Sequence, residues 1–193
     1  MTRRLPATFS APLTAGWLIA AIVMLALLQT AAIGKMVTDR AALLRNGQEV
    51  VLETGAIDPR DLFRGHYTIL NLAITRIPAG SVTRDPALEP GAPVYVTLAE
   101  GDDGYWRATA LWADPPADQS AVIRGVFNYD TASQIILSFP FDRYFAPEDR
   151  ALELEALTRA DRLGLILALD GAGNGAIKGL MVDGQRLYEE ALY

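Results

Sequence analysis

The chain has 193 residues, 51% of them apolar, and its 17 basic and 23 acidic side chains give a formal net charge of −6. One folded domain is expected at this length. Because the sequence contains no cysteine, a disulfide scaffold, a thiolate metal site and a thiol nucleophile are excluded.

The first predicted element is a membrane-spanning helix. No charged residue lies between Arg4 and Lys35, and the stretch from Ala15 to Gly34 supplies the about 20 apolar residues that cross ~30 Å of hydrocarbon. We therefore expect the lipid bilayer to surround residues 15–34. A cleaved signal peptide is the alternative, with small residues at positions 30–32 as the cleavage site.

Charge near this helix predicts its orientation. Arg3 and Arg4 favour a cytoplasmic N-terminal tail, residues 1–14, although basic residues at positions 35, 40 and 45 reduce the asymmetry. Residues 35–46 are interpreted as a spacer, with a short amphipathic helix leaving the membrane. The sequence thus predicts a single-pass protein of the inner membrane, with residues 47–193 forming a β-rich domain in the periplasm.

The predicted periplasmic domain is acidic. After Lys35 the sequence carries 14 basic and 23 acidic side chains, a balance of −9. Because nucleic-acid affinity depends mainly on basic side chains that neutralise phosphates, nucleic acid is excluded as a partner.

From residue 47 onward the apolar residues alternate as in β-strands. Strands are predicted over residues 48–54 and, as one long strand, 66–77; hairpins over 94–98 with 105–112, 121–127 with 134–139, and 165–169 with 176–182; and a short terminal strand after Gly184. Helix-start and helix-end signals predict one helix over residues 147–162. The fold class is therefore mainly β: one transmembrane helix, then a small antiparallel β-sandwich or partly closed barrel with one α-helix.

Few residues suit catalysis or metal binding. His66 is the single histidine, so no imidazole pair exists for a metal or a proton relay. Residues 170–175 resemble the start of a calcium loop, but Ala172 and Met181 stand where oxygen ligands are required, which favours a hairpin turn. Lys178 could serve in a Ser-Lys dyad or as a charge that protects an edge strand. No cofactor and no metal is expected.

The most site-like segment spans residues 58–67, Asp-Pro-Arg-Asp-Leu-Phe-Arg-Gly-His-Tyr. It resembles the bacterial membrane-anchored family named for a Gly-Asp-Tyr-x-x-Leu-x-Tyr signature, from which it departs at His66 and Leu72. The resemblance extends through Arg143 and Tyr144 and through residues 175–179. It implies an accessory subunit of a multi-span membrane protein, without established catalysis. From the residues alone, a turn held by hydrogen bonds is an equal interpretation of the segment.

A cluster of aromatic residues at positions 139–145 fits either an interface or the core. We expect a membrane-anchored periplasmic binding or accessory subunit. The alternative is an envelope hydrolase or an anionic-ligand-binding module, for which convergence of the cations in one concave pocket would be the sign. The candidate binding residues are Arg60, Asp61, Arg64, Gly65, His66, Tyr67, Arg124, Arg143, Tyr144 and Lys178.

Overall fold

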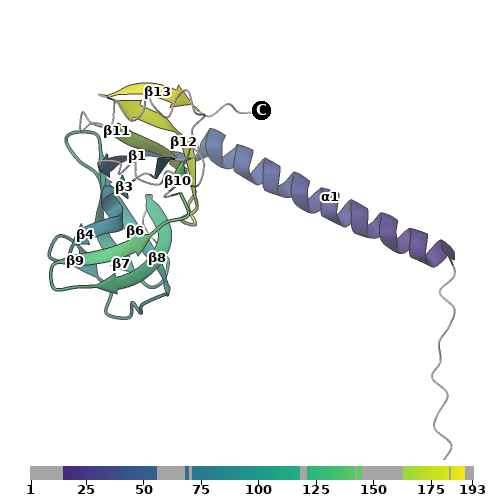
Figure 1. The fold of residues 1–193 in the computed structure, drawn as a ribbon, viewed down its shortest axis with the longest axis horizontal. Coiled ribbons are helices and arrows are strands. Elements are labelled where there is room, and N and C mark those ends of the chain that lie inside the picture. Colours follow the sequence, from purple (N-terminus) through teal and green to yellow (C-terminus); the bar gives the residue numbers. More distant parts are fainter. Residues whose placement is uncertain are drawn as a thin grey trace, which may run out of the picture. The chain divides into compact units, whose positions relative to one another are not determined.

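The computed structural model describes residues 15–55, 68–69, 71–117, 121–141, 143–144, 163–182 and 184–189. The chain divides into two compact units, Met1–Asp39 and Arg40–Tyr193. The first unit contains most of a long helix, and the second contains the β-strands (Figure 1).

The helix α1 (Ala15–Asn46) is continuous through the predicted membrane segment and the predicted spacer. Its large apolar side chains are exposed, for example Trp17 at 73% and Met24 at 72%. In the part of the chain that the structure describes, α1 is the one helix long and apolar enough to cross a membrane, and it lies near the N-terminus, where a signal sequence also lies. The predicted long apolar helix is therefore confirmed.

The strands form an open and mostly antiparallel sheet, so the mainly β fold class is confirmed. Eleven strands join in the order β13-β12-β11-β1-β7-β6-β8-β9-β4, with β3 beside β1 and β5 beside β7, and β10 pairs with β2 in a separate small sheet. Of these pairs, β1 with β7 and β5 with β7 are parallel. The strand bounds are β1 (Gln48–Gly55), β2 (Thr68–Ile69), β3 (Asn71–Leu72), β4 (Arg76–Pro78), β5 (Thr83–Arg84), β6 (Pro93–Glu100), β7 (Trp106–Trp112), β8 (Val122–Asp130), β9 (Gln134–Ser138), β10 (Arg143–Tyr144), β11 (Leu163–Leu169), β12 (Gly175–Val182) and β13 (Gln185–Glu189).

The three predicted hairpins and the terminal strand are confirmed. In the β6–β7 hairpin the N–H of Gly101 donates to the carbonyl of Tyr105 at 2.9 Å. Gly104 in the same turn has a φ of +79°, a conformation that glycine adopts without steric cost. The β8–β9 and β11–β12 pairs follow, and β13 pairs with β12. The predicted helix at 147–162 lies outside the described residues.

The predicted long strand over residues 66–77 is wrong for its described part. The chain there forms β2, β3, the 3-10 helix η1 (Ala73–Thr75) and β4. The hydroxyl of Thr75 donates to the carbonyl of Leu72 at 2.7 Å, and this turn sends β3 to pair with β1 and β4 to pair with β9. Leu72, Ile74 and Ile77 all enter the core, so the apolar residues at odd and even positions reflect a change of direction.

The core lies against β1, β6, β8 and β11. Val50, Leu52, Val96, Ile123 and Phe127 are fully buried, and burial of each such side chain contributes about 1.5–3 kcal/mol. Every residue of β11 is buried, which is typical of a strand covered on both faces.

Candidate functional site

Six of the predicted site residues, Arg60, Asp61, Arg64, Gly65, His66 and Tyr67, lie outside the described residues. The backbone of Arg143 and Tyr144 forms β10 and pairs with β2, with Tyr144 opposite Thr68. Thr68 and Ile69, which follow the 58–67 segment in the sequence, therefore lie beside Arg143 and Tyr144, the second segment of the family resemblance.

Lys178 lies on β12 and forms an ion pair. Its Nζ lies 2.7 Å from Oε1 of Glu49, and its side chain is 16% exposed. Arg186 on β13 binds the other oxygen of the same carboxylate. The hydrogen bond from Lys178 lowers the pKa of Glu49, and the charges of Arg186 and Lys178 add to this effect, whereas partial burial opposes it. The carboxylate therefore joins β1, β12 and β13.

Two interpretations of Lys178 can be judged from these contacts. β12 lies between β11 and β13, so the edge-strand interpretation is wrong. In the described part of the chain Lys178 pairs with Glu49, whereas the hydroxyl of Ser138 contacts Oδ1 of Asn128 at 3.3 Å. These two side chains therefore do not form a Ser-Lys dyad.

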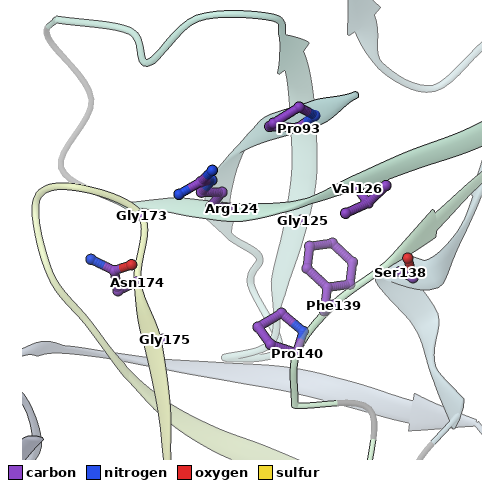
Figure 2. A pocket seen from close by; sticks show the side chains of 10 residues that line it. All are labelled: Pro93, Arg124, Gly125, Val126, Ser138, Phe139, Pro140, Gly173, Asn174 and Gly175. Atoms are coloured by element: carbon purple, nitrogen blue, oxygen red, sulfur yellow. The ribbon is translucent and has the colours of Figure 1, made fainter. Parts of the chain in front are cut away.

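A concave site lies on the sheet where β6, β8 and the end of β9 meet the 170–175 turn. The cavity has a volume of about 570 Å³. Figure 2 shows Arg124 on the side of this turn, and Val126, Phe139 and Pro140 on the other side. The lining residues are Pro93, Arg124, Gly125, Val126, Ser138, Phe139, Pro140, Gly173, Asn174 and Gly175.

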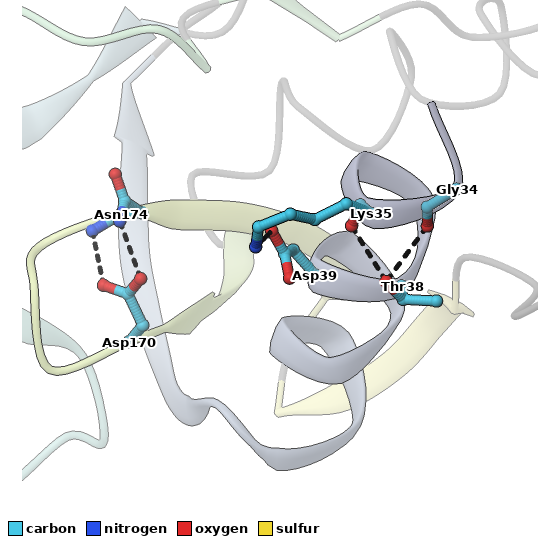
Figure 3. A network of polar contacts seen from close by, with 6 residues as sticks. All are labelled: Gly34, Lys35, Thr38, Asp39, Asp170 and Asn174. Carbon is cyan, nitrogen blue, oxygen red and sulfur yellow. Dashed lines mark hydrogen bonds and ion pairs between the residues drawn. The ribbon is translucent and has the colours of Figure 1, made fainter. Parts of the chain in front are cut away.

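The 170–175 turn forms one wall, and its shape comes from Asp170. Oδ1 of Asp170 accepts the backbone N–H of Ala172 at 2.9 Å. Oδ1 also accepts the backbone N–H of Asn174, and Oδ2 accepts the Asn174 amide, both at 2.7 Å (Figure 3). Gly173 has a φ of +88°, which favours glycine. The predicted hairpin turn is confirmed. Among the described residues no group of three or more His, Cys, Asp or Glu side chains could hold a metal ion.

Gly125, which lines the cavity, is closely packed against its neighbours. A Cβ on Gly125 would lie 2.8 Å from the Phe139 ring and 2.8 Å from the Ser138 carbonyl, so a larger residue would displace that ring. Phe139 stacks on Phe141 with ring centroids 5.4 Å apart, and both rings are buried. These two members of the aromatic cluster therefore serve as core.

Among the described residues, Arg124 is the charged group that lines the cavity. Its guanidinium carbon lies 6.0 Å from the centroid of the Tyr95 ring, a favourable cation–π distance. Within the described residues no carboxylate forms an ion pair with it, in contrast to Lys178. The side chains of two candidate cations are described. Arg124 lines the cavity, whereas Lys178 pairs with Glu49 outside it.

Sequence reasoning missed four of the ten lining residues, namely Pro93, Gly125, Val126 and Ser138. Pro93, Val126 and Ser138 come from three strands, and no local pattern marks them. The aromatic cluster pointed to Phe139 and Pro140, and the turn pattern pointed to Gly173 and Asn174, but neither signal predicted a shared cavity.

In its described part the chain is a protein with one long apolar helix, followed by an open β-sheet domain. This domain carries a cavity that Arg124 lines together with apolar residues and a glycine-rich turn. The family model described as GDYXXLXY protein matches residues 29–180, which is most of the chain. The chain belongs to the GDYXXLXY protein family, as the motif at residues 58–67 predicted. No curated protein and no solved structure matches it.

Proposed function

We propose that this chain is a single-pass protein of a bacterial inner membrane and that its β domain acts in the periplasm as an accessory, binding subunit of a membrane protein assembly. The observation that carries the proposal is α1, whose apolar side chains are exposed along the helix. An exposed apolar surface of this extent is unfavourable in water and favourable in lipid.

An uncleaved anchor fits α1 better than a signal peptide does. The alternative cleavage site at residues 30–32 lies inside helical backbone, where the Thr30 hydroxyl donates to the carbonyl of Ala26 at 2.9 Å. The helix then continues to Asn46. Just beyond the apolar stretch, Lys35 and Asp39 form an i,i+4 ion pair at 2.7 Å, and Thr38 donates to the carbonyl of Gly34 (Figure 3). Such charged and polar groups are typical of the water interface at the end of a membrane span.

The orientation can be tested by labelling single cysteines, because the natural chain has none. Ser81 is exposed in the β domain, and Ser10 lies in the predicted cytoplasmic tail. In spheroplasts we expect a membrane-impermeant maleimide to label Ser81→Cys, whereas Ser10→Cys reacts only after lysis. The opposite pattern would place the β domain in the cytoplasm and contradict the proposed location.

The contacts of Lys178 and Ser138, the two side chains considered for catalysis, favour a binding role. Lys178 is occupied by Glu49, and Ser138 contacts Asn128, so neither is poised as a nucleophile or a base in the described structure. The family resemblance implies an accessory role, and we propose a multi-span membrane protein as the partner.

The partner can be tested by affinity purification of the full chain from detergent-solubilised membranes. Arg64→Ala changes the signature motif, and Arg84→Ala is the matched control because Arg84 lies outside the motif and pairs with Asp130. We expect the wild type and Arg84→Ala to retain one integral membrane protein that Arg64→Ala loses. Recovery of no integral membrane protein by the wild type would overturn the subunit role.

A further inference from the structure

We propose that the cavity between β6, β8, β9 and the 170–175 turn binds a carboxylate carried on a compact apolar group, with Arg124 as the residue that binds the carboxylate. This goes beyond the accessory role, since it assigns a ligand class to a site of the β domain. It holds whether or not α1 anchors the chain.

Arg124 gives the cavity a positive charge. A guanidinium remains charged at any physiological pH and presents paired N–H donors that match the two oxygens of a carboxylate. In the described part of the chain Arg124 stacks near Tyr95 and forms no ion pair, whereas Lys178, Arg84 and Arg107 each contact an acidic side chain. Arg124 is thus a cation available to a ligand.

The side of the cavity away from Arg124 is apolar. Val126, Phe139 and Pro140 give the cavity an apolar side, and Val126 is 38% exposed although it is aliphatic. The volume of about 570 Å³ lies in the range of about 300–1,000 Å³ that is typical of small-molecule sites. An apolar group bound there would cover Val126, so the ligand needs both an anionic and an apolar part.

A carboxylate fits this cavity better than a phosphate does. One cation balances one negative charge, and the apolar walls would leave further oxygens of a phosphate without donors. Apart from Arg124, the polar side chains that the described residues contribute to the cavity are Ser138 and Asn174. Each has a protein partner already, Asn128 for Ser138 and Asp170 for Asn174. A monoanion with two oxygens is therefore the better match.

Hydrogen bonds hold the backbone of Arg124 in place. The backbone N–H of Arg124 donates to the carbonyl of Gly173 at 2.8 Å, and Arg124 lies opposite Tyr95 in the β6–β8 pair. The backbone from which the guanidinium extends is thus held on both sides, which reduces the ordering cost of binding.

The proposal can be tested by calorimetric titration of the full chain in nonionic detergent. The probes are 3-phenylpropionate and N-acetyl-leucyl-phenylalanine, each compared with its neutral amide, and inorganic phosphate serves as a competitor. We expect at least one of the two acids to bind, at least about tenfold more tightly than its amide, and we expect phosphate not to displace it. Binding of neither acid would overturn the proposal. Tighter binding of 3-phenylpropionate identifies a free organic acid as the ligand, and tighter binding of the peptide identifies a protein C-terminus.

Two variants make the test specific for the site. Arg124→Gln is expected to weaken the binding of the acid at least about tenfold, and Arg84→Gln, an arginine of the same domain outside the cavity, should leave it unchanged. Equal affinity for acid and amide, or equal loss in both variants, would overturn the proposal. The acid–amide comparison uses the wild type and does not depend on the folding of a variant. Failure here would leave the maleimide result unaffected, because that labelling reports only the membrane orientation.

Discussion

The backbone N–H of Arg124 donates a 2.8 Å hydrogen bond to the carbonyl oxygen of Gly173. Arg124 lies in the part of β8 that precedes the residues paired with β9. The contact joins this part of β8 to the turn between β11 and β12. Along the main sheet these two regions are connected through β1 and β7, where Leu52 and Trp106 are the paired residues. The turn therefore adds a second link between the two regions of the sheet and places the cavity at that link.

The first prediction concerns Gly173. Its φ of +88° strains any residue with a Cβ, and that Cβ would lie 3.3 Å from both N and Cβ of Arg124. We expect Gly173→Ala to lower the free energy of unfolding by about 1–2 kcal/mol. Denaturant unfolding of the full chain in detergent, followed by near-ultraviolet circular dichroism, measures the change.

Gly171→Ala is the matched control for that substitution, because a Cβ on Gly171 meets nothing within 4 Å and its φ is not in the left-handed region. It should leave the unfolding free energy within about 0.5 kcal/mol of the wild type. Equal destabilisation by the two substitutions would show that the turn is not held as described.

The second prediction concerns the pH dependence that Glu49 contributes. Its pKa is lowered from 4.5 by the hydrogen bond from Lys178 and the charge of Arg186. The stabilisation is therefore present above about pH 4.5 and is lost as the pH falls through the lower pKa of the folded state. At about pH 7 we expect Glu49→Gln to unfold more easily by about 1 kcal/mol, since the pair is partly exposed.

The sign of this effect is checked by repeating the unfolding at about pH 3, where the difference between Glu49→Gln and the wild type should shrink. Glu89→Gln is the control, since Glu89 is exposed and forms no ion pair among the described residues. A constant difference between Glu49→Gln and the wild type over this pH range would contradict the ionic role of Glu49.

The third prediction concerns Asp103 in the β6–β7 turn. Two hydrogen bonds from Arg107, at 2.8 and 2.6 Å, lower the pKa of Asp103 to about 2. Arg107→Gln should therefore raise this pKa towards 3.8, the ordinary value. Carbon-13 carboxyl titration by nuclear magnetic resonance measures it, and an unchanged pKa in Arg107→Gln would refute the assigned cause.

Local patterns predicted the hairpins because their turns carry their own signals. Gly104 and the glycines at 171, 173 and 175 mark turns, and strong alternation flanks them. The same reasoning failed between Thr68 and Pro78, where apolar residues at odd and even positions suggested one strand buried on both faces. The choice between that strand and a bend at η1 depends on which distant strand pairs with each part, and one local pattern does not contain that information.

The cavity could be predicted only in fragments. Arg124 attracted attention as a cation and the 170–175 segment as a turn, yet their hydrogen bond joins residues far apart in the sequence. Lys178, grouped with Arg124 by charge alone, instead pairs with Glu49 across β11. Whether a surface cation is paired or available depends on strand order, which is a property of the whole fold.

The most direct test of the central claim, that α1 stays in lipid as an anchor, is intact mass spectrometry of the protein after alkaline extraction of bacterial membranes. The account predicts that the protein remains in the membrane pellet with a mass that includes residues 15–34. A chain that begins near Ile33 and is recovered from the soluble periplasmic fraction would contradict it.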